Sequence, residues 1–366
     1  MISTECSSRL FTLDLQLKLI LNSNSSFLFC TGSLSQSQLA AAAAVGASST
    51  TTSPNTALRK KYLDLIEYGN KHYETTTQNL YQLRKTILLE GLPPETEEEI
   101  EDRRKDSPRC SLRGLVWKIL LGIKECDAEK YIELLKLGSS DQYQKIRKDI
   151  SRTFMKDALF CQAVSQDKLS RCLNAFVHMT SEIKSNLNYV QGMNAICGAF
   201  LYVLPELDAF YCFQQLVLHY CHLYLVPKIS GVHTALNILD TILEFVDPEL
   251  YGYLKTRSYD PVLLTHAILS LGTSTPPLGE LLHLWDFYFA FGIHLNVICT
   301  IAQLLLMRDT LLAHPSPCSL FRSLPELDSE TIINLSIHIV RQLPDDLYDL
   351  LVDHPIADIS SQDEFV

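Results

Sequence analysis

The chain has 366 residues, of which 47% are hydrophobic and 20% charged, and its formal net charge at pH 7 is −11. Enough apolar side chains are present to build one large globular domain or two smaller ones. The acidic balance argues against binding to a nucleic-acid backbone, since the one basic run, residues 59–61, is short and suits the solvated start of a helix.

Eleven cysteines are scattered along the chain without a Cys-x-x-Cys pair, which is typical of proteins in a reducing cytosol. His219, Cys221 and His222 lie close enough to suggest a metal site. Half-buried helix residues are the favoured explanation, because no second group of ligands completes a tetrahedron. We therefore expect no metal and no resident cofactor.

The longest apolar run, residues 195–204, is too short to cross a bilayer, so we expect a cytoplasmic protein without membrane insertion. Residues 10–21 are rich in leucine, but the polar residues that interrupt them argue against a signal or transit peptide. Residues 22–56 are rich in Ser, Thr, Ala and Asn and offer little apolar surface. We predict that residues 1–56 form a disordered or variable segment.

Beyond this segment, apolar residues recur at three- and four-residue spacing, with Pro or Gly at the breaks, and this pattern predicts an all-α fold of a dozen or more short helices. We divide it into N-terminal helices and a linker (57–105), a main domain (106–355) and a C-terminal tail (356–366). Predicted helices include 58–89 as one or two helices, 95–104, 278–291, 295–312, 329–342 and 345–352. A further helix is expected between a Ser111 cap and a Gly122 stop.

Arg113 and Trp117 lie one turn apart on that helix, so the arginine stem can pack on the indole. A structural anchor is the first interpretation of this pair, and catalysis is the second.

Asp149 and Arg152 are three residues apart, so on a helix the carboxylate can hold the guanidinium in one direction. A guanidinium fixed in this way can neutralise charge on a transferring phosphoryl group. Taken alone, the pair is also explained by an ordinary surface ion pair of little energetic value.

The segment Tyr189-Val190-Gln191-Gly192 is predicted to form a loop before an apolar helix that begins near Met193. A glutamine carboxamide can donate to and accept from an attacking water, and the glycine permits close backbone approach. A plain turn with a capping asparagine is the alternative.

Read in order, Arg-x-x-x-Trp, Ile-x-x-Asp-x-x-Arg and Tyr-x-Gln resemble the signature of the TBC domain, the GTPase-activating module for Rab-like small GTPases. The resemblance covers roughly residues 91–312 and is looser to about residue 355. It implies the TBC helical fold, with Arg152 as an arginine finger and Gln191 as a glutamine finger, both supplied in trans to a Rab-like or Ras-like GTPase. It implies supporting roles for Arg113, Trp117, Ile146, Asp149, Tyr189, Gly192, Met193 and Asn194.

On this resemblance GTP and Mg²⁺ belong to the partner GTPase, and the chain itself is expected to bind no nucleotide and to turn over no substrate of its own. The sequence has no Gly-x-x-x-x-Gly-Lys-Ser/Thr loop. The competing hypothesis is a TBC-fold scaffold or adaptor that binds a small GTPase without catalysis.

Residues 275–292 look like the fungal mitotic-exit or septation checkpoint branch of the family, half of a two-component GTPase activator at the spindle pole body. This likeness implies negative regulation of mitotic exit or septation and a separate scaffold subunit. Asn188 departs from the general family pattern, where a glycine usually precedes the tyrosine, and His283 stands where an arginine is frequent.

Overall fold

The computed structural model describes residues 17–18, 20–21, 54–71, 76–182, 189–226 and 228–357. Every regular element within these ranges is a helix, so the predicted all-α fold is confirmed. The helices of the N-terminal half are α3 (Pro54–Lys71), α4 (Thr76–Glu90), α5 (Glu97–Arg104), α6 (Leu112–Leu121), α7 (Ala128–Lys136), α8 (Tyr143–Ile150), α9 (Ala158–Ala163), α10 (Gln166–Glu182), α11 (Met193–Val203), α12 (Glu206–Gln215), the π-helix η4 (Leu216–Tyr220) and α13 (His222–Leu225).

The second half is helical as well. Its elements are α14 (Ser230–Val246), α15 (Pro248–Thr256), the 3₁₀ helix η5 (Pro261–Leu264), α16 (Thr265–Leu269), α17 (Leu278–Phe291), α18 (Leu295–Leu306), α19 (Arg308–Ala313), the 3₁₀ helix η6 (Pro317–Arg322), α20 (Ser329–Gln342) and α21 (Asp345–Asp353).

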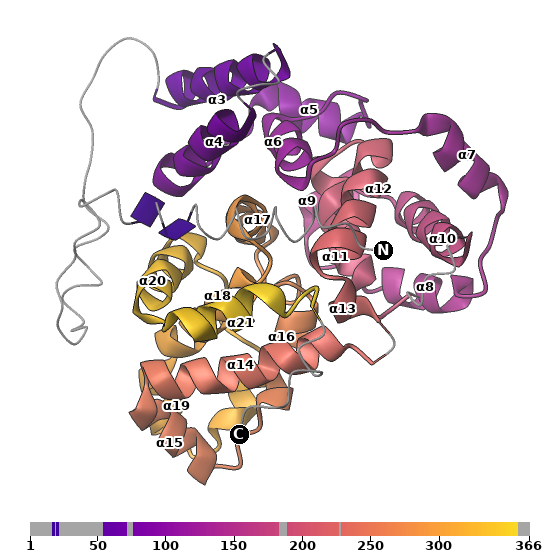
Figure 1. Cartoon of the computed structure of the whole chain (residues 1–366). Helices are drawn as coiled ribbons and strands as arrows, with labels where there is room; N and C mark the ends of the chain where they lie inside the picture. The colour runs from indigo at the N-terminus through magenta and orange to yellow at the C-terminus, as the bar shows by residue number, and fades with distance from the viewer. Residues whose placement is uncertain are drawn as a thin grey trace.

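Helix α17 joins the two halves of the molecule. Figure 1 shows α3–α13 along the top and the right of the molecule and α14–α16 and α18–α21 toward the lower left, with α17 between the two groups. It packs against α4 and α6 above and against α18 and α20 below. Most of its residues are buried, as expected for a helix with neighbours on several sides, and His283 is exposed.

The ends of several helices are set by the residues that the sequence indicates. The Ser111 hydroxyl accepts a hydrogen bond from the Gly114 N–H at 3.2 Å, and α6 stops at Gly122, whose φ of 75° suits glycine. The charged α5 begins with a reciprocal capping box between Thr96 and Glu99.

Two local features differ from the sequence expectation. The predicted helix 295–312 is interrupted at Met307, where the chain starts a new helix, α19. The apolar spacing continues across this break and therefore does not reveal it. The π-helical turn η4 interrupts the helical run after α12, and it also keeps the apolar spacing.

A short piece of the predicted variable segment lies in the core. Leu17, Ile20 and Leu21 are buried, which differs from the expectation for residues 1–56. Their spacing of three and four residues puts them on one side of a helix, and Lys18, which lies between them in the sequence, is partly exposed. Lys18 donates to Asp345 at 2.6 Å, and Arg341 donates to the Leu21 carbonyl at 3.1 Å. The piece is thereby fastened to α20 and α21.

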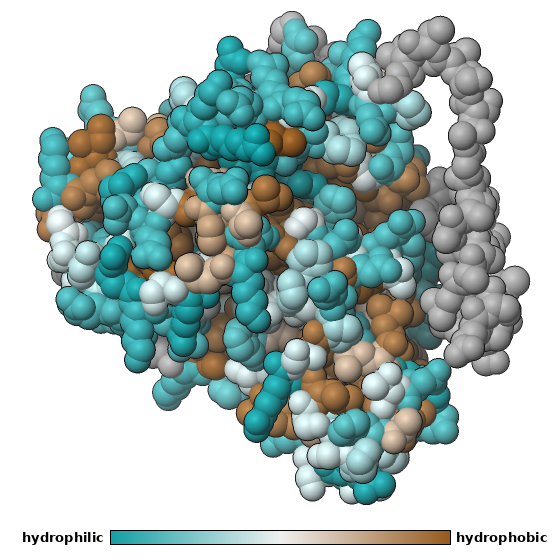
Figure 2. Space-filling model, turned by 180° about the vertical axis from the view of Figure 1, so that it is seen from behind, coloured by the Kyte–Doolittle hydropathy of each residue, from teal (hydrophilic) through white to brown (hydrophobic). Residues whose placement is uncertain are grey.

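On the face opposite to that of Figure 1, hydrophilic residues predominate and hydrophobic residues appear in patches among them (Figure 2). Among the described residues, no helix has the length and apolar character needed to cross a bilayer. Asn188 and the last nine residues of the tail, 358–366, lie outside the described residues.

Candidate functional site

Arg152 lies in the turn that follows α8. Ile146 and Ile150 are buried on the inner side of this helix, which packs against α10 and α11. The chain then leaves the helix, and the Arg152 N–H is held by the Asp149 carbonyl at 3.2 Å. The Arg152 side chain is 53% exposed, whereas that of Asp149 is 5% exposed. A buried carboxylate thus carries an outward-facing guanidinium.

Asp149 connects the arginine turn to the glutamine turn. One of its carboxylate oxygens accepts from Arg152 Nη2 at 2.6 Å, and the other accepts from the Tyr189 hydroxyl at 2.9 Å. Burial, followed by the charge of Asp149, raises the pKa of Tyr189 well above its ordinary value, so the hydroxyl keeps its proton and donates it. The predicted Asp149–Arg152 contact is therefore present, and it belongs to a larger network than a surface ion pair.

Asn194, the second residue of α11, fastens the two turns a second time. Its side-chain oxygen accepts from the Gly192 N–H at 3.1 Å, and its amide nitrogen donates to the Thr153 hydroxyl at 2.8 Å. Lys145 adds a third link, because its ammonium group donates to the Tyr189 carbonyl at 2.9 Å. These bonds fix the backbone on both sides of Gln191 relative to the turn that holds Arg152.

Gln191 itself is exposed at the tip of its turn, immediately before α11. The next residue, Gly192, has a φ of 111°, a conformation that side chains rarely adopt, which explains the glycine at this position. The buried thioether of Met193 lies 3.4 Å from the Val190 N–H and closes the turn from inside. The predicted loop at a helix N-terminus is confirmed.

Arg113 and Trp117 lie away from these turns and share one partner, Asp286 on α17. The indole N–H donates to Asp286 at 2.7 Å, and the guanidinium of Arg113 donates to both carboxylate oxygens at 3.2 Å. Burial raises the pKa of Asp286, and the neighbouring Arg113 charge and the Trp117 N–H oppose that rise.

Arg113 and Trp117 therefore form a structural anchor, which is the first interpretation of their spacing. The sequence suggests that the arginine stem packs on the indole, whereas in the structure both side chains bind Asp286. The Trp117 ring also lies 5.7 Å from that of Phe200, in the C-terminal half of α11. Helices α6 and α17 therefore support the helix that starts at the glutamine turn. Asp286 lies within residues 275–292, and its role is not predictable from the sequence, because a contact across 169 residues leaves no local pattern.

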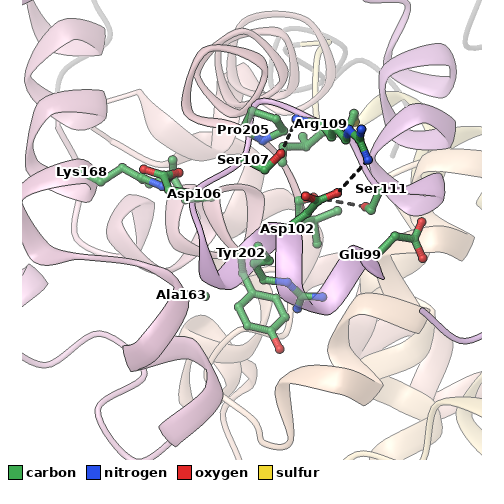
Figure 3. A pocket seen from close by; sticks show the side chains of 15 residues that line it. Glu99, Asp102, Asp106, Ser107, Arg109, Ser111, Ala163, Lys168, Tyr202 and Pro205 are labelled. Atoms are coloured by element: carbon green, nitrogen blue, oxygen red, sulfur yellow. Dashed lines mark hydrogen bonds and ion pairs between the residues drawn. The ribbon is translucent and has the colours of Figure 1, made fainter. Parts of the chain in front are cut away.

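A small polar pocket lies between α5, α10 and α11, and neither Arg152 nor Gln191 lines it. Its cavity volume is about 40 Å³, against roughly 300–1,000 Å³ for ordinary ligand pockets. Charged side chains at the pocket already have partners. Asp106 pairs with Lys168 (Figure 3). Arg103 pairs with Glu95, and its guanidinium lies 4.2 Å from the Tyr202 ring centre. We therefore assign no nucleotide to it.

His219 lies in η4 and His222 begins α13, and Cys221 is the residue between the two helices. Burial lowers the pKa of both histidines. In the part of the chain that the structure describes, no group of three or more His, Cys, Asp or Glu side chains is placed to hold a metal ion.

The fold and these two turns define a class of protein: a helical domain that offers an arginine and a glutamine on its surface, open to another macromolecule. The model of the Rab-GTPase-TBC domain matches residues 110–312 of the chain. The chain belongs to this family, as its motifs predict.

Two relatives fall in the expected checkpoint branch. "Putative mitotic check point protein BUB2" of Dictyostelium discoideum is 69% identical over 306 residues, which are 83% of this chain and 82% of that protein. "Cell division control protein 16" of Schizosaccharomyces pombe is 42% identical over 292 residues, 79% of this chain and 93% of that protein. The predicted likeness to the mitotic-exit or septation branch is confirmed.

The crystal structure of the Ypt/Rab-GAP domain of Gyp1p has the same fold. It superimposes with a TM-score of 0.57 at 19% sequence identity, over 76% of this chain and 96% of that chain.

Proposed function

We propose that this protein is a GTPase-activating protein that supplies Arg152 and Gln191 to a Rab-like or Ras-like small GTPase. The observation that carries the proposal is the Asp149 carboxylate, which binds Arg152 with one oxygen and the tyrosine of the glutamine turn with the other. An adaptor has no need to hold two exposed polar side chains on one buried frame. A catalyst does, since misplaced charge lowers the rate.

In this mechanism the exposed guanidinium of Arg152 neutralises charge that develops on the transferring phosphoryl group. The Gln191 carboxamide orients the attacking water, because it can accept from the water and donate to the phosphate. GTP and Mg²⁺ are held by the partner, and this chain supplies no covalent step.

We also propose a role in restraining mitotic exit or septation, together with a scaffold subunit and at the spindle pole body. The cellular role is supported by the relatives, which are named as a mitotic check point protein and a cell division control protein. A scaffold that binds both proteins would raise the local concentration of the GTPase without adding catalytic groups.

The test is single-turnover GTP hydrolysis by a panel of small GTPases with the wild type, Arg152→Ala, Arg152→Lys and Gln191→Ala. The alanine variant of Arg152 should lower the maximal rate roughly 10³-fold, and lysine should restore little because an ammonium lacks the planar fork. Gln191→Ala should lower the maximal rate while the half-saturating concentration is largely kept. Binding to a GTPase without any acceleration would instead identify the adaptor.

A further inference from the structure

The helix and loop around Arg152 carry positive charge in an acidic protein. Residues 143–163 contain five lysines and arginines and two aspartates, whereas the whole chain has a net charge of −11. Both aspartates have partners within this segment. Asp149 is buried against Arg152, and Asp157 caps α9 by accepting from the Phe160 N–H at 2.9 Å. The charge that remains toward solvent is positive.

Lys148 and Lys156 stand on either side of Arg152 in the sequence, and both are exposed. Neither forms an ion pair with a carboxylate of the described residues. Several lysines elsewhere have such partners: Lys118 with Asp208 at 2.7 Å, Lys130 with Glu182 at 2.9 Å and Lys255 with Asp240 at 3.1 Å. The lysines beside the arginine turn are therefore available to a partner.

Two apolar side chains are exposed in the same stretch. Met155 is 54% exposed and Leu159 is 58% exposed. The loop is held in place from inside, because Phe154 adopts a φ of 46° and its ring packs on that of Phe160 with centroids 4.8 Å apart. A non-glycine residue at positive φ costs free energy and persists only where its surroundings fix it. Met155 and Leu159 are thus displayed by a rigid loop.

We propose that Met155 and Leu159, with Lys148 and Lys156, form a docking surface for an acidic face of the GTPase that lies beside its nucleotide. This inference rests on the proposed function, and it names the chemistry of the partner. An apolar centre with a charged rim is the usual anatomy of a protein interface. Opposite charges raise the rate of encounter by roughly 10- to 10³-fold at low ionic strength, and salt removes the gain.

The experiment measures single-turnover hydrolysis by GTP-loaded small GTPases against the concentration of this protein, at roughly 0.02 M and roughly 0.5 M NaCl. The double variant Lys148→Glu/Lys156→Glu should raise the half-saturating concentration roughly 10- to 100-fold at low salt and much less at high salt. The maximal rate should stay at the wild-type value. Met155→Ala/Leu159→Ala should raise the half-saturating concentration to a similar extent at both salt concentrations.

Lys60→Glu is the control. Lys60 is an exposed lysine without an ion pair among the described residues, and it belongs to α3, which is well separated from α8 in Figure 1. An equal effect of Lys60→Glu would overturn the docking surface in favour of net charge. The docking surface would also be overturned if Lys148→Glu/Lys156→Glu lowered only the maximal rate, or if its effect on the half-saturating concentration were as large at high salt as at low salt.

The same variants are titrated against the panel loaded with a non-hydrolysable GTP analogue, which separates the two proposals. Wild-type binding without acceleration refutes the proposed activity, and the dissociation constants of the lysine variants then decide on the docking surface. If the wild type accelerates hydrolysis and the lysine variants bind and activate as the wild type does, the docking surface alone is refuted. No binding and no acceleration refute both.

Discussion

Tyr189→Phe tests whether the buried network serves catalysis or only stability. The change removes one hydroxyl and keeps the ring, so packing in the core is preserved. It deletes the 2.9 Å hydrogen bond to the Asp149 carboxylate, and with it one of the ties between the glutamine turn and the arginine turn. Arg152 keeps its own bond to Asp149.

Two effects of different size should follow. A hydrogen bond to a charged group contributes about 1.5–3 kcal/mol to stability, which for a domain of this size lowers Tm by roughly 3–10 °C. The second effect is kinetic. A shift of about 1 Å in a positioned group can cost about 100-fold in rate, so we expect the maximal rate of GTP hydrolysis to fall roughly 10- to 100-fold, with the half-saturating concentration little changed.

The assay pairs thermal unfolding with single-turnover hydrolysis, and Tyr62→Phe is the matched control. Tyr62 is equally buried and donates to the Gly91 carbonyl at 2.8 Å, far from the two turns in the sequence. This variant should lose stability and keep the full rate. If Tyr189→Phe also melts earlier yet activates at the wild-type rate, the network is structural and the reasoning fails.

Three further changes test other parts of the fold. Burial lowers the pKa of His294 to about 3 and that of His354 to about 4, whereas an unfolded histidine takes up its proton near pH 6.5. Their stabilising effect should be complete above about pH 6.5 and be lost as the pH falls toward 4. His294→Phe should therefore make the unfolding free energy, measured in urea, depend less steeply on pH over this range. An unchanged dependence on pH would contradict a buried, neutral His294. Asp286→Ala leaves the buried guanidinium of Arg113 without its carboxylate and should cost about 3–5 kcal/mol of unfolding free energy, so an unaltered denaturation midpoint would refute the anchor. Ile20→Asp should lower Tm by several degrees, and an unchanged Tm would place Leu17, Ile20 and Leu21 outside the core.

Helix positions were largely predictable from the sequence, because apolar period and capping chemistry act over a few residues. The bounds of α17 and α20 agree with the prediction, and the Ser111 cap and Gly122 stop are present. The break at Met307 was not predictable, since both of the helices that it separates keep the same apolar spacing.

In the candidate site, too, contacts between residues close in the sequence could be predicted and contacts between distant residues could not. The contact between Asp149 and Arg152 follows from helical spacing, and the structure contains it. The bridge from Asp149 to Tyr189 joins residues 40 apart and depends on how α8 packs beside α11, which no local pattern encodes. The motif order suggested that the two turns act together, and the shared carboxylate gives the physical reason.

The short piece at residues 17–21 has a consequence for how the protein is made. Lys18 meets Asp345, a partner 327 positions later in the chain. At roughly 5–20 residues per second, a ribosome needs about 16–65 s to travel that distance. Throughout that time Leu17, Ile20 and Leu21 have no α20 and α21 to cover them. The last helices to be synthesised therefore complete the burial of some of the first residues, and a chain that stops before α20 leaves this apolar face open to chaperones and proteases.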